Sequence, residues 1–171
     1  MVFDTFNVKH KIPYATSVIM DDYGQDWNWG MSFFDSHPED QVVKHEGKMR
    51  FALNNCSQRG SLPVSARSII EDMRLTFVNN NITLISFYGF GADTDSYPWH
   101  KDKMDVFLVQ VQGHCALTVE GTEYEETPYD LCKGSSFYIP RGTHHRIQPE
   151  ASRITWSFGV EGPSDPSEYI S

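Results

Sequence analysis

The sequence lacks any run of about 18 apolar residues, and its first ten residues contain no apolar stretch of the kind found in secretory leaders. Neither a membrane span nor a signal peptide is therefore expected, and we place the protein in the cytoplasm. Basic residues are also scarce, because 14 lysines and arginines face 23 acidic residues, for a net charge of −9. Such a charge repels a phosphate backbone, so neither nucleic acid nor a membrane is expected as a partner.

Cysteine is the next scarce residue. Cys56, Cys115 and Cys132 are odd in number and have no Cys-x-x-Cys spacing, which argues against a disulfide framework or a zinc knuckle. We expect reduced, buried thiols. The chain also lacks internal repeats and low-complexity tracts, and its 171 residues suit one well-buried core. These features predict a single domain over residues 1–171.

Patterning divides this domain into a covering layer, a barrel and a tail. Residues 1–80 are irregular apart from one amphipathic helix, predicted from Ser65 to about Asn79 with Ser65 as its cap. The aromatic-rich stretch 26–34 shows no period of 3.6, so short strands that cover the core are expected there. Residues 161–171 form a polar tail that we expect to fray.

Residues 81–160 contain short β-branched and aromatic runs separated by turn residues, which is typical of a β-sandwich or barrel. Gln112-Gly113-His114 lies between two runs and indicates a tight hairpin turn, with Gly113 free to take a positive φ. We therefore predict a mainly all-β fold with one N-terminal amphipathic helix. The predicted strands are Ile82 to Tyr88, Val106 to Gln112, Cys115 to Glu120, Ser136 to Ile139, and Ile154 to Val160.

Two histidines and an aspartate carry the most specific chemistry. His100 and Asp102 are two residues apart, so on a strand both would point to the same face. A third ligand comes from a second motif, Gly134 to His145, in which a glycine turn, an apolar strand and a Pro-x-Gly turn lead to a histidine. Two imidazoles and one carboxylate on one face of a metal leave three positions open, which favours Fe(II) over zinc. We predict an iron site at His100, Asp102 and His145, which manganese or zinc could also occupy.

The two motifs together resemble those of the JmjC-type cupin oxygenases, with the ribosomal oxygenases and the asparaginyl hydroxylases as the most similar members. The resemblance covers about residues 84–160. It implies a cupin double-stranded β-helix, or jelly-roll, barrel in a hydroxylase that uses Fe(II), 2-oxoglutarate and O2, with His145 as the ligand and His144 as its neighbour. The motifs read His100-x-Asp102-x-x-Asp105-Val106-Phe107-x-x-Gln110-x-x-Gly113 and Phe137-Tyr138-Ile139-Pro140-Arg141-Gly142-Thr143-x-His145.

One position departs from this family. Two residues past Gly113 the family usually has a lysine or arginine that pairs with the distal carboxylate of 2-oxoglutarate, whereas this chain has Cys115. A buried carboxylate needs a cationic partner, so another base is required if the co-substrate binds. Arg153 and Thr155 resemble the Arg-x-Ser/Thr anchor that prolyl hydroxylases carry on the last barrel strand. We predict that these two residues bind the co-substrate.

Several other residues have weaker signals. Arg141 and Arg146 are lesser candidates for the anchor, and Tyr97 would contact the co-substrate or form a wall of the pocket. The acidic stretch 120–126 is expected to be an exposed loop. Four aromatic residues are expected to cover the core rather than to line a substrate groove, namely Trp27, Trp29, Phe33 and Phe34. Four histidines are expected to be solvated or satisfied, namely His10, His37, His45 and His114.

The sequence therefore predicts an enzyme, a non-haem Fe(II) dioxygenase that uses 2-oxoglutarate to hydroxylate or demethylate a small molecule or a peptide. Cys115 leaves two alternatives open. One is a cupin metalloenzyme that does not use 2-oxoglutarate, such as a small-molecule dioxygenase or an isomerase. The other is a non-catalytic cupin that binds a ligand. The sequence does not specify the oligomeric state, and a homodimer is compatible with it.

Overall fold

The computed structural model describes residues 3–20, 26–45, 48–58, 62–78, 80–91 and 98–162, so Tyr97 and nearly all of the predicted tail lie outside the described residues. The helices are α1 (Thr5–Lys9), α2 (Trp27–Asp35) and α3 (Val64–Thr76), with short 3-10 helices η2 (Pro38–Asp40) and η3 (Cys56–Gln58). The strands are β1 (Tyr14–Ser17), β2 (Gln41–His45), β3 (Lys48–Leu53), β4 (Asn81–Gly89), β5 (Asp105–Val119), β6 (Tyr129–Leu131), β7 (Ser135–Ile139) and β8 (His145–Glu161).

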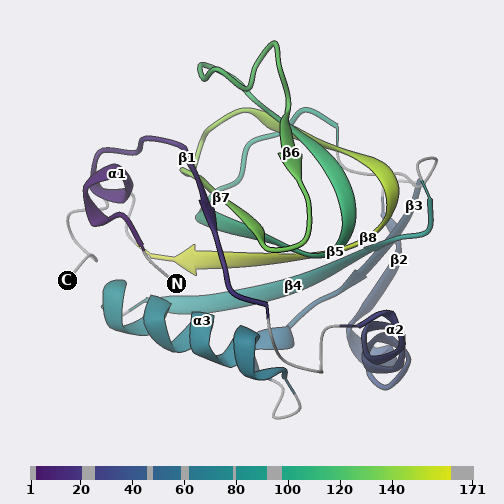
Figure 1. Ribbon diagram of the computed structural model, residues 1–171. Coiled ribbons are helices and arrows are strands. Elements are labelled where there is room, and N and C mark those ends of the chain that lie inside the picture. Colours follow the sequence, from purple (N-terminus) through teal and green to yellow (C-terminus); the bar gives the residue numbers. More distant parts are fainter. Residues whose placement is uncertain are drawn as a thin grey trace.

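The strands form an antiparallel sheet in the order β1-β7-β5-β8-β4-β3-β2, with β6 beside β5. The two longest strands, β5 and β8, pair along both of their halves. Residues 105–110 lie opposite 155–160, and residues 115–119 lie opposite 145–149. Figure 1 shows how this pair curves over the rest of the sheet. The curvature closes the sheet around an interior, as expected of a barrel.

The pairing of β5 with β8 is irregular where Gly113 of β5 lies opposite Arg153 of β8, between two register shifts. Gly113 has a φ of +77°, which confirms the predicted positive φ. The predicted hairpin turn is wrong, because both flanking runs continue as β5 and share β8 as their partner. A Cβ atom at Gly113 would collide with the carbonyl oxygen of Ser152. A glycine is therefore required by the close approach of the two strands.

Gly121 provides a matched comparison for this position. It has the same φ of +77°, but a Cβ atom there would meet nothing within 4 Å. We expect Gly113→Ala to lower the free energy of unfolding by roughly 3 kcal/mol, since it adds a steric collision to the cost of the left-handed conformation. Gly121→Ala should cost only about 1 kcal/mol. Urea unfolding of both variants measures the difference, and equal losses would show that the contact with Ser152 is unimportant.

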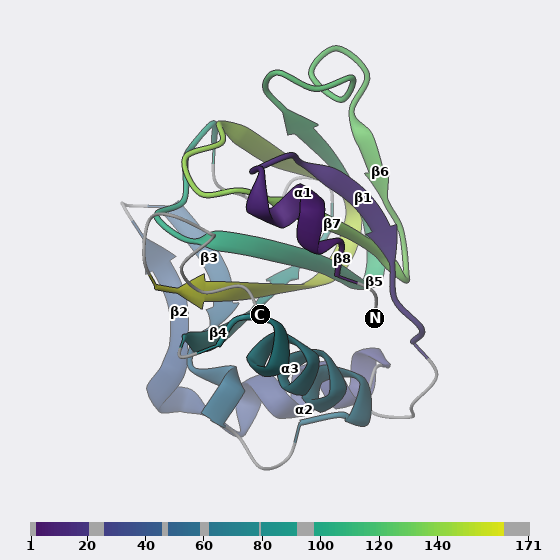
Figure 2. The same ribbon diagram turned by 90° about the vertical axis from the view of Figure 1, so that its left-hand side faces the viewer.

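The two faces of the sheet have different neighbours. Along β4 burial alternates, so that Ile82 and Leu84 pack beneath the helices while Thr83, Ile85 and Phe87 face the barrel interior. Figures 1 and 2 show α3 running along the outer side of β4. A large core lies on this helix side, and it includes Ile69, Ile70, Met73, Phe77, Phe107, Trp156 and Phe158. A smaller one lies on the side of the barrel interior, with Val106, Leu108, Cys115, Leu117, Val119, Leu131, Phe137 and Ile139.

The described residues contain three α-helices, where the sequence analysis expected one. In α3 the predicted apolar stripe is buried, but the helix begins at Val64 with Pro63 at its N-cap and no side-chain cap, so the prediction of Ser65 as the cap is wrong. The stretch 26–34, expected as strands, is mostly α2, whose N-cap Asp26 accepts the backbone N–H of Trp29 at 2.7 Å. None of the helices that the structure describes is both long and apolar enough to cross a membrane.

The residues of α2 show why this helix forms. Gly30 lies so close to Ile154 of β8 that a Cβ atom would collide with that side chain. Phe33 and Phe34 are buried in the large core, with Trp27 and Trp29 packed against it. The expectation that these aromatic residues cover the core is therefore confirmed.

Candidate metal centre

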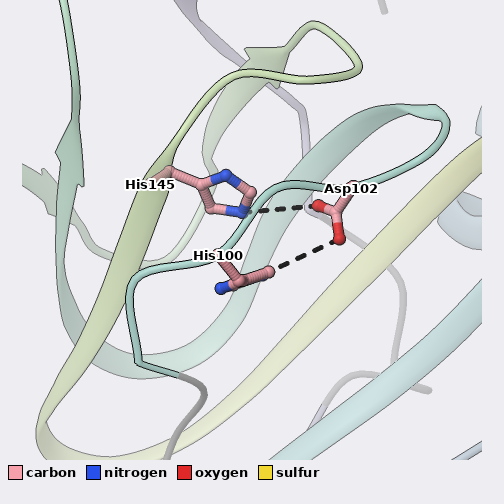
Figure 3. A group of neighbouring side chains, drawn as sticks. All are labelled: His100, Asp102 and His145. Carbon is pink, nitrogen blue, oxygen red and sulfur yellow. Dashed lines mark ion pairs between the residues drawn. The ribbon is translucent and has the colours of Figure 1, made fainter.

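The three predicted metal ligands lie together (Figure 3), and all three line one cavity. His145 is the first residue of β8, and His100 and Asp102 belong to the connection between β4 and β5. The Nε2 atom of His145 is 3.3 Å from Oδ2 of Asp102, and Nε2 of His100 is 3.7 Å from Oδ1. The expected placement of His100 and Asp102 on one strand is wrong, since His100 forms only an isolated bridge with His145.

Backbone contacts orient both imidazole rings. Nδ1 of His100 lies 2.7 Å from the carbonyl oxygen of Pro98, and Nδ1 of His145 lies 2.8 Å from that of Thr143. An Nδ1–H that donates to a carbonyl leaves the Nε2 lone pair directed at a metal. Burial lowers the pKa of His100, although the hydrogen bond to Pro98 opposes this effect. The lowered pKa favours the neutral form of His100, which is the form that binds metal.

The three side chains fit a divalent metal of the facial-triad type. One ligand atom from each of the three side chains lies within 4.8 Å of the other two. Nε2 of His145 is 3.3 Å from Oδ2 of Asp102, and ligand atoms at right angles around a metal, with bonds of about 2.1 Å, lie about 3 Å apart. Two imidazoles and a carboxylate are the donor set of non-haem iron sites. His145 is buried, whereas His100 and Asp102 are partly exposed to a cavity. Room for further ligands thus exists on the cavity side.

His144 points away from this cluster. Its Nδ1 atom lies 3.5 Å from a carboxylate oxygen of Glu120, and its ring packs 4.9 Å from that of Trp99. Consecutive residues at the start of a strand project to opposite faces, so only one of the two histidines can face the cavity. The geometry thus brings His145, and not His144, to Asp102.

A cavity of about 580 Å³ extends from the metal cluster into the barrel. Its inner walls are mainly apolar, and its polar residues lie mostly around the ends of β4 and β8 and on the segment that follows β3. The lining includes Ile85, Phe87, Val106, Leu108 and Ile147, together with Asn54, Asn55, Ser57, Asn81, Thr83, Lys103 and Glu161. The contribution of Asn54, Asn55 and Ser57 was not predicted from the sequence.

Arg153 also lines this cavity, from the part of β8 that lies opposite Gly113. Its side chain is only 4% exposed, and its guanidinium lies 5.8 Å from the ring centre of Phe87. Nη1 of Arg153 donates to the hydroxyl of Thr155 at 2.9 Å, and that hydroxyl donates to Oε1 of Gln110 at 2.6 Å. A hydroxyl has a single proton, so Thr155 positions Arg153 and has no proton left for a ligand. The role of Gln110 was not predicted.

The positive charge of Arg153 affects the thiol of Cys115, the residue at which the sequence departs from the motif described above. Burial raises the pKa of the Cys115 thiol, and the positive charge of Arg153 partly offsets this. The two groups are therefore close in space, although they lie on different strands. A cation carried by β8 is therefore present beside Cys115 of β5.

The lesser candidates for an anchor are engaged elsewhere. Arg141 approaches the buried carboxylate of Asp105 at 3.6 Å, and Arg146 lies 5.5 Å from the ring centre of Trp99. Neither of these arginines is among the cavity-lining residues that the structure describes.

His114 takes part in a second, exposed cluster. Its two ring nitrogens lie 2.7 and 2.8 Å from carboxylate oxygens of Asp130 and Glu150. The expectation that His114 is satisfied is confirmed. Because all three side chains are at least 40% exposed, solvent screens their interaction.

Comparisons with known proteins rest on the fold alone. No protein-family model matches the sequence, and no curated protein matches it. The ribosomal oxygenase YcfD of Escherichia coli in complex with cobalt and 2-oxoglutarate aligns with 88% of this chain at a TM-score of 0.62 and 14% identity. A second structure of that enzyme aligns with 72% at a TM-score of 0.52 and 16% identity. An RmlC-like cupin from Shewanella frigidimarina aligns with 74% at a TM-score of 0.46 and 15% identity.

The alignments with YcfD cover a larger share of this chain than of the YcfD chains. This chain covers 48% and 35% of the length of the two YcfD chains. At such identities the likeness concerns the path of the backbone and not the activity. The chain has a mainly β, antiparallel cupin-like fold with a few short helices, and a His-Asp-His cluster in its cavity could hold a metal ion.

Proposed function

We propose that the protein is an Fe(II)- and 2-oxoglutarate-dependent oxygenase that hydroxylates or demethylates a small molecule or a peptide. The observation that carries this proposal is the position of Arg153, a buried cation that lines the same cavity as His100, Asp102 and His145. An oxygenase of this class needs a metal at one end of its co-substrate and a cation at the other.

The residues of the cavity divide this task. His100, Asp102 and His145 would hold the iron, which supplies oxidative chemistry with O2 when bound. The planar guanidinium of Arg153 suits a carboxylate, because it can donate two parallel N–H···O bonds. Thr155 holds Arg153 in place through the hydrogen bond at 2.9 Å.

Apolar residues line much of the cavity that holds the metal cluster and Arg153, among them Ile85, Leu108 and Ile147. Excluding water there strengthens the interaction between Arg153 and a bound carboxylate. The same exclusion protects a reactive centre from side reactions. In this proposal the cavity provides an oriented and partly apolar site for a dicarboxylate.

Thermal unfolding of the manganese-loaded protein tests the co-substrate assignment. We expect 2-oxoglutarate and its unreactive analogue N-oxalylglycine to raise the Tm by roughly 5–10 °C at a hundredfold excess over Kd. Glutarate is the matched control, since it has both carboxylates but lacks the keto group that chelates a metal. It should have little effect, and all three compounds should have little effect on protein stripped of metal.

Other outcomes would favour the alternatives. Metal binding without any shift by 2-oxoglutarate would contradict the co-substrate assignment and favour a cupin metalloenzyme of another kind. A protein that binds no metal at all would contradict the whole proposal and favour a non-catalytic, ligand-binding cupin.

A further inference from the structure

The metal ligands come from two separate chain segments, which backbone hydrogen bonds hold side by side. His100 and His145 exchange two such bonds, each of 3.0 Å, between their N–H and carbonyl groups. The N–H of Gly142 donates to the carbonyl oxygen of Asp102 at 2.9 Å. The spacing between the carboxylate of Asp102 and the ring of His145 therefore depends on how the loop between β7 and β8 sits against the segment before β5.

A buried carboxylate joins these two segments a short distance behind the ligands. Asp105 is 0% exposed, and its Oδ1 accepts the backbone N–H of Arg141 at 2.8 Å. Nε of Arg141 lies 3.6 Å from the same oxygen, and Nη1 of Arg141 donates to the carbonyl oxygen of Gly162 at 3.2 Å. Asp105 thus connects the start of β5 to the loop that leads to His145, and through Arg141 to the end of β8.

The contact between Asp105 and Arg141 is suited to holding the two ligand-bearing segments together. A carboxylate wholly removed from water costs free energy unless it is paired and hydrogen-bonded, as Asp105 is by Arg141. Asp105 follows Asp102 by three residues and Arg141 precedes His145 by four, so a change in their contact shifts both ligand-bearing segments. Neither residue belongs to the cluster of possible ligands.

We propose that Asp105 is a positioning residue for the metal centre, and that its contact with Arg141 sets the separation of Asp102 and His145 and thereby the metal affinity. This inference rests on the metal site of the proposed function but not on 2-oxoglutarate. Groups that orient metal ligands from behind typically contribute 10- to 100-fold to metal affinity. The effect is therefore measurable on the metal alone.

Cobalt titration of the purified protein tests this role, with the visible absorption of bound Co(II) as the signal and His145→Ala as the blank. Asp105→Asn keeps an oxygen that can accept the N–H of Arg141 but removes the charge. We expect it to raise the Kd for cobalt by about 10- to 100-fold and to alter the absorption bands of bound Co(II). Arg141→Gln should produce a smaller change in the same direction, and the double variant should be no worse than Asp105→Asn.

Asp26→Asn is the matched control. Asp26 also accepts a backbone N–H through its Oδ1, at 2.7 Å from Trp29, but it caps a helix on the outer side of the sheet. The cobalt affinity of the Asp26→Asn variant should equal that of the wild type. If Asp105→Asn is folded and lowers only the Tm, with an unchanged Kd and spectrum, its role is structural and the inference is wrong. If Asp105→Asn does not fold, an unchanged Kd in Arg141→Gln overturns the inference. A wild type that binds no cobalt overturns the metal site itself.

Discussion

Replacement of His145 by alanine is expected to abolish metal binding, whereas replacement of His144 should leave it intact. Nε2 of His145 lies 3.3 Å from Asp102, while His144 is directed toward Glu120. Loss of a direct ligand should raise the Kd by more than about a hundredfold, beyond the effect of groups that only orient ligands. Cobalt or manganese titration of both variants measures the difference.

The comparison also has an internal check on folding. Metal should raise the Tm of the wild type and of His144→Ala but not that of His145→Ala, because a ligand stabilises only the protein that binds it. Far-UV circular dichroism of the metal-free variants verifies that both retain the fold. Retained affinity in His145→Ala together with loss in His144→Ala would reverse the ligand assignment.

Replacement of Arg153 by glutamine is expected to remove the stabilisation by N-oxalylglycine while metal binding persists. Truncating one partner of a buried, hydrogen-bonded charge pair costs about 2 kcal/mol or more, which corresponds to roughly a thirtyfold loss of affinity. Isothermal titration of the manganese-loaded variant with N-oxalylglycine measures the loss. The metal Kd should change little, since Arg153 is not among the possible ligands.

Arg146→Gln is the control for this experiment. Arg146 is on the same strand but stacks over Trp99, outside the residues that line the cavity. Its removal should leave the affinity for N-oxalylglycine unchanged. Equal affinity in wild type and Arg153→Gln would show that the cavity has no carboxylate anchor at this position, and the co-substrate proposal would fail there.

The barrel strands, and the residues of the His100, Asp102 and His145 cluster, could be predicted because their signals are local. Val106 to Gln112 and Ile154 to Val160 are runs rich in apolar and β-branched residues, which suit the pleated, half-buried surface of a sheet. The Pro-x-Gly turn before His145 fixes where β8 begins, and the turn is readable from the sequence. At these positions, neighbouring residues in the sequence were enough to predict the strands and the turn.

The errors concern properties that depend on distant residues. Gly113 resembles a hairpin turn until β8 is known to pair with both of its flanks. Gly30 weakens the helical pattern of α2, because a glycine costs about 1 kcal/mol in a helix. A glycine is needed at this position because the side chain of Ile154, more than a hundred residues away in the chain, leaves no room for a Cβ atom. The Asp26 cap was a local sign of this helix that the aromatic residues obscured.

The position of β8 in the sheet has a consequence for the order of folding. This strand lies between β4 and β5, yet it follows both in the chain, and its residue Glu161 pairs with Asn81. Until β8 is inserted, β4 and β5 present unpaired edges, which are prone to association with other chains. Pairing over such sequence distances is typically slow, on the order of milliseconds to seconds. Since His145 arrives with β8, the proposed metal site is complete only after this strand is in place, and the rate of metal uptake would then report the closure of the barrel.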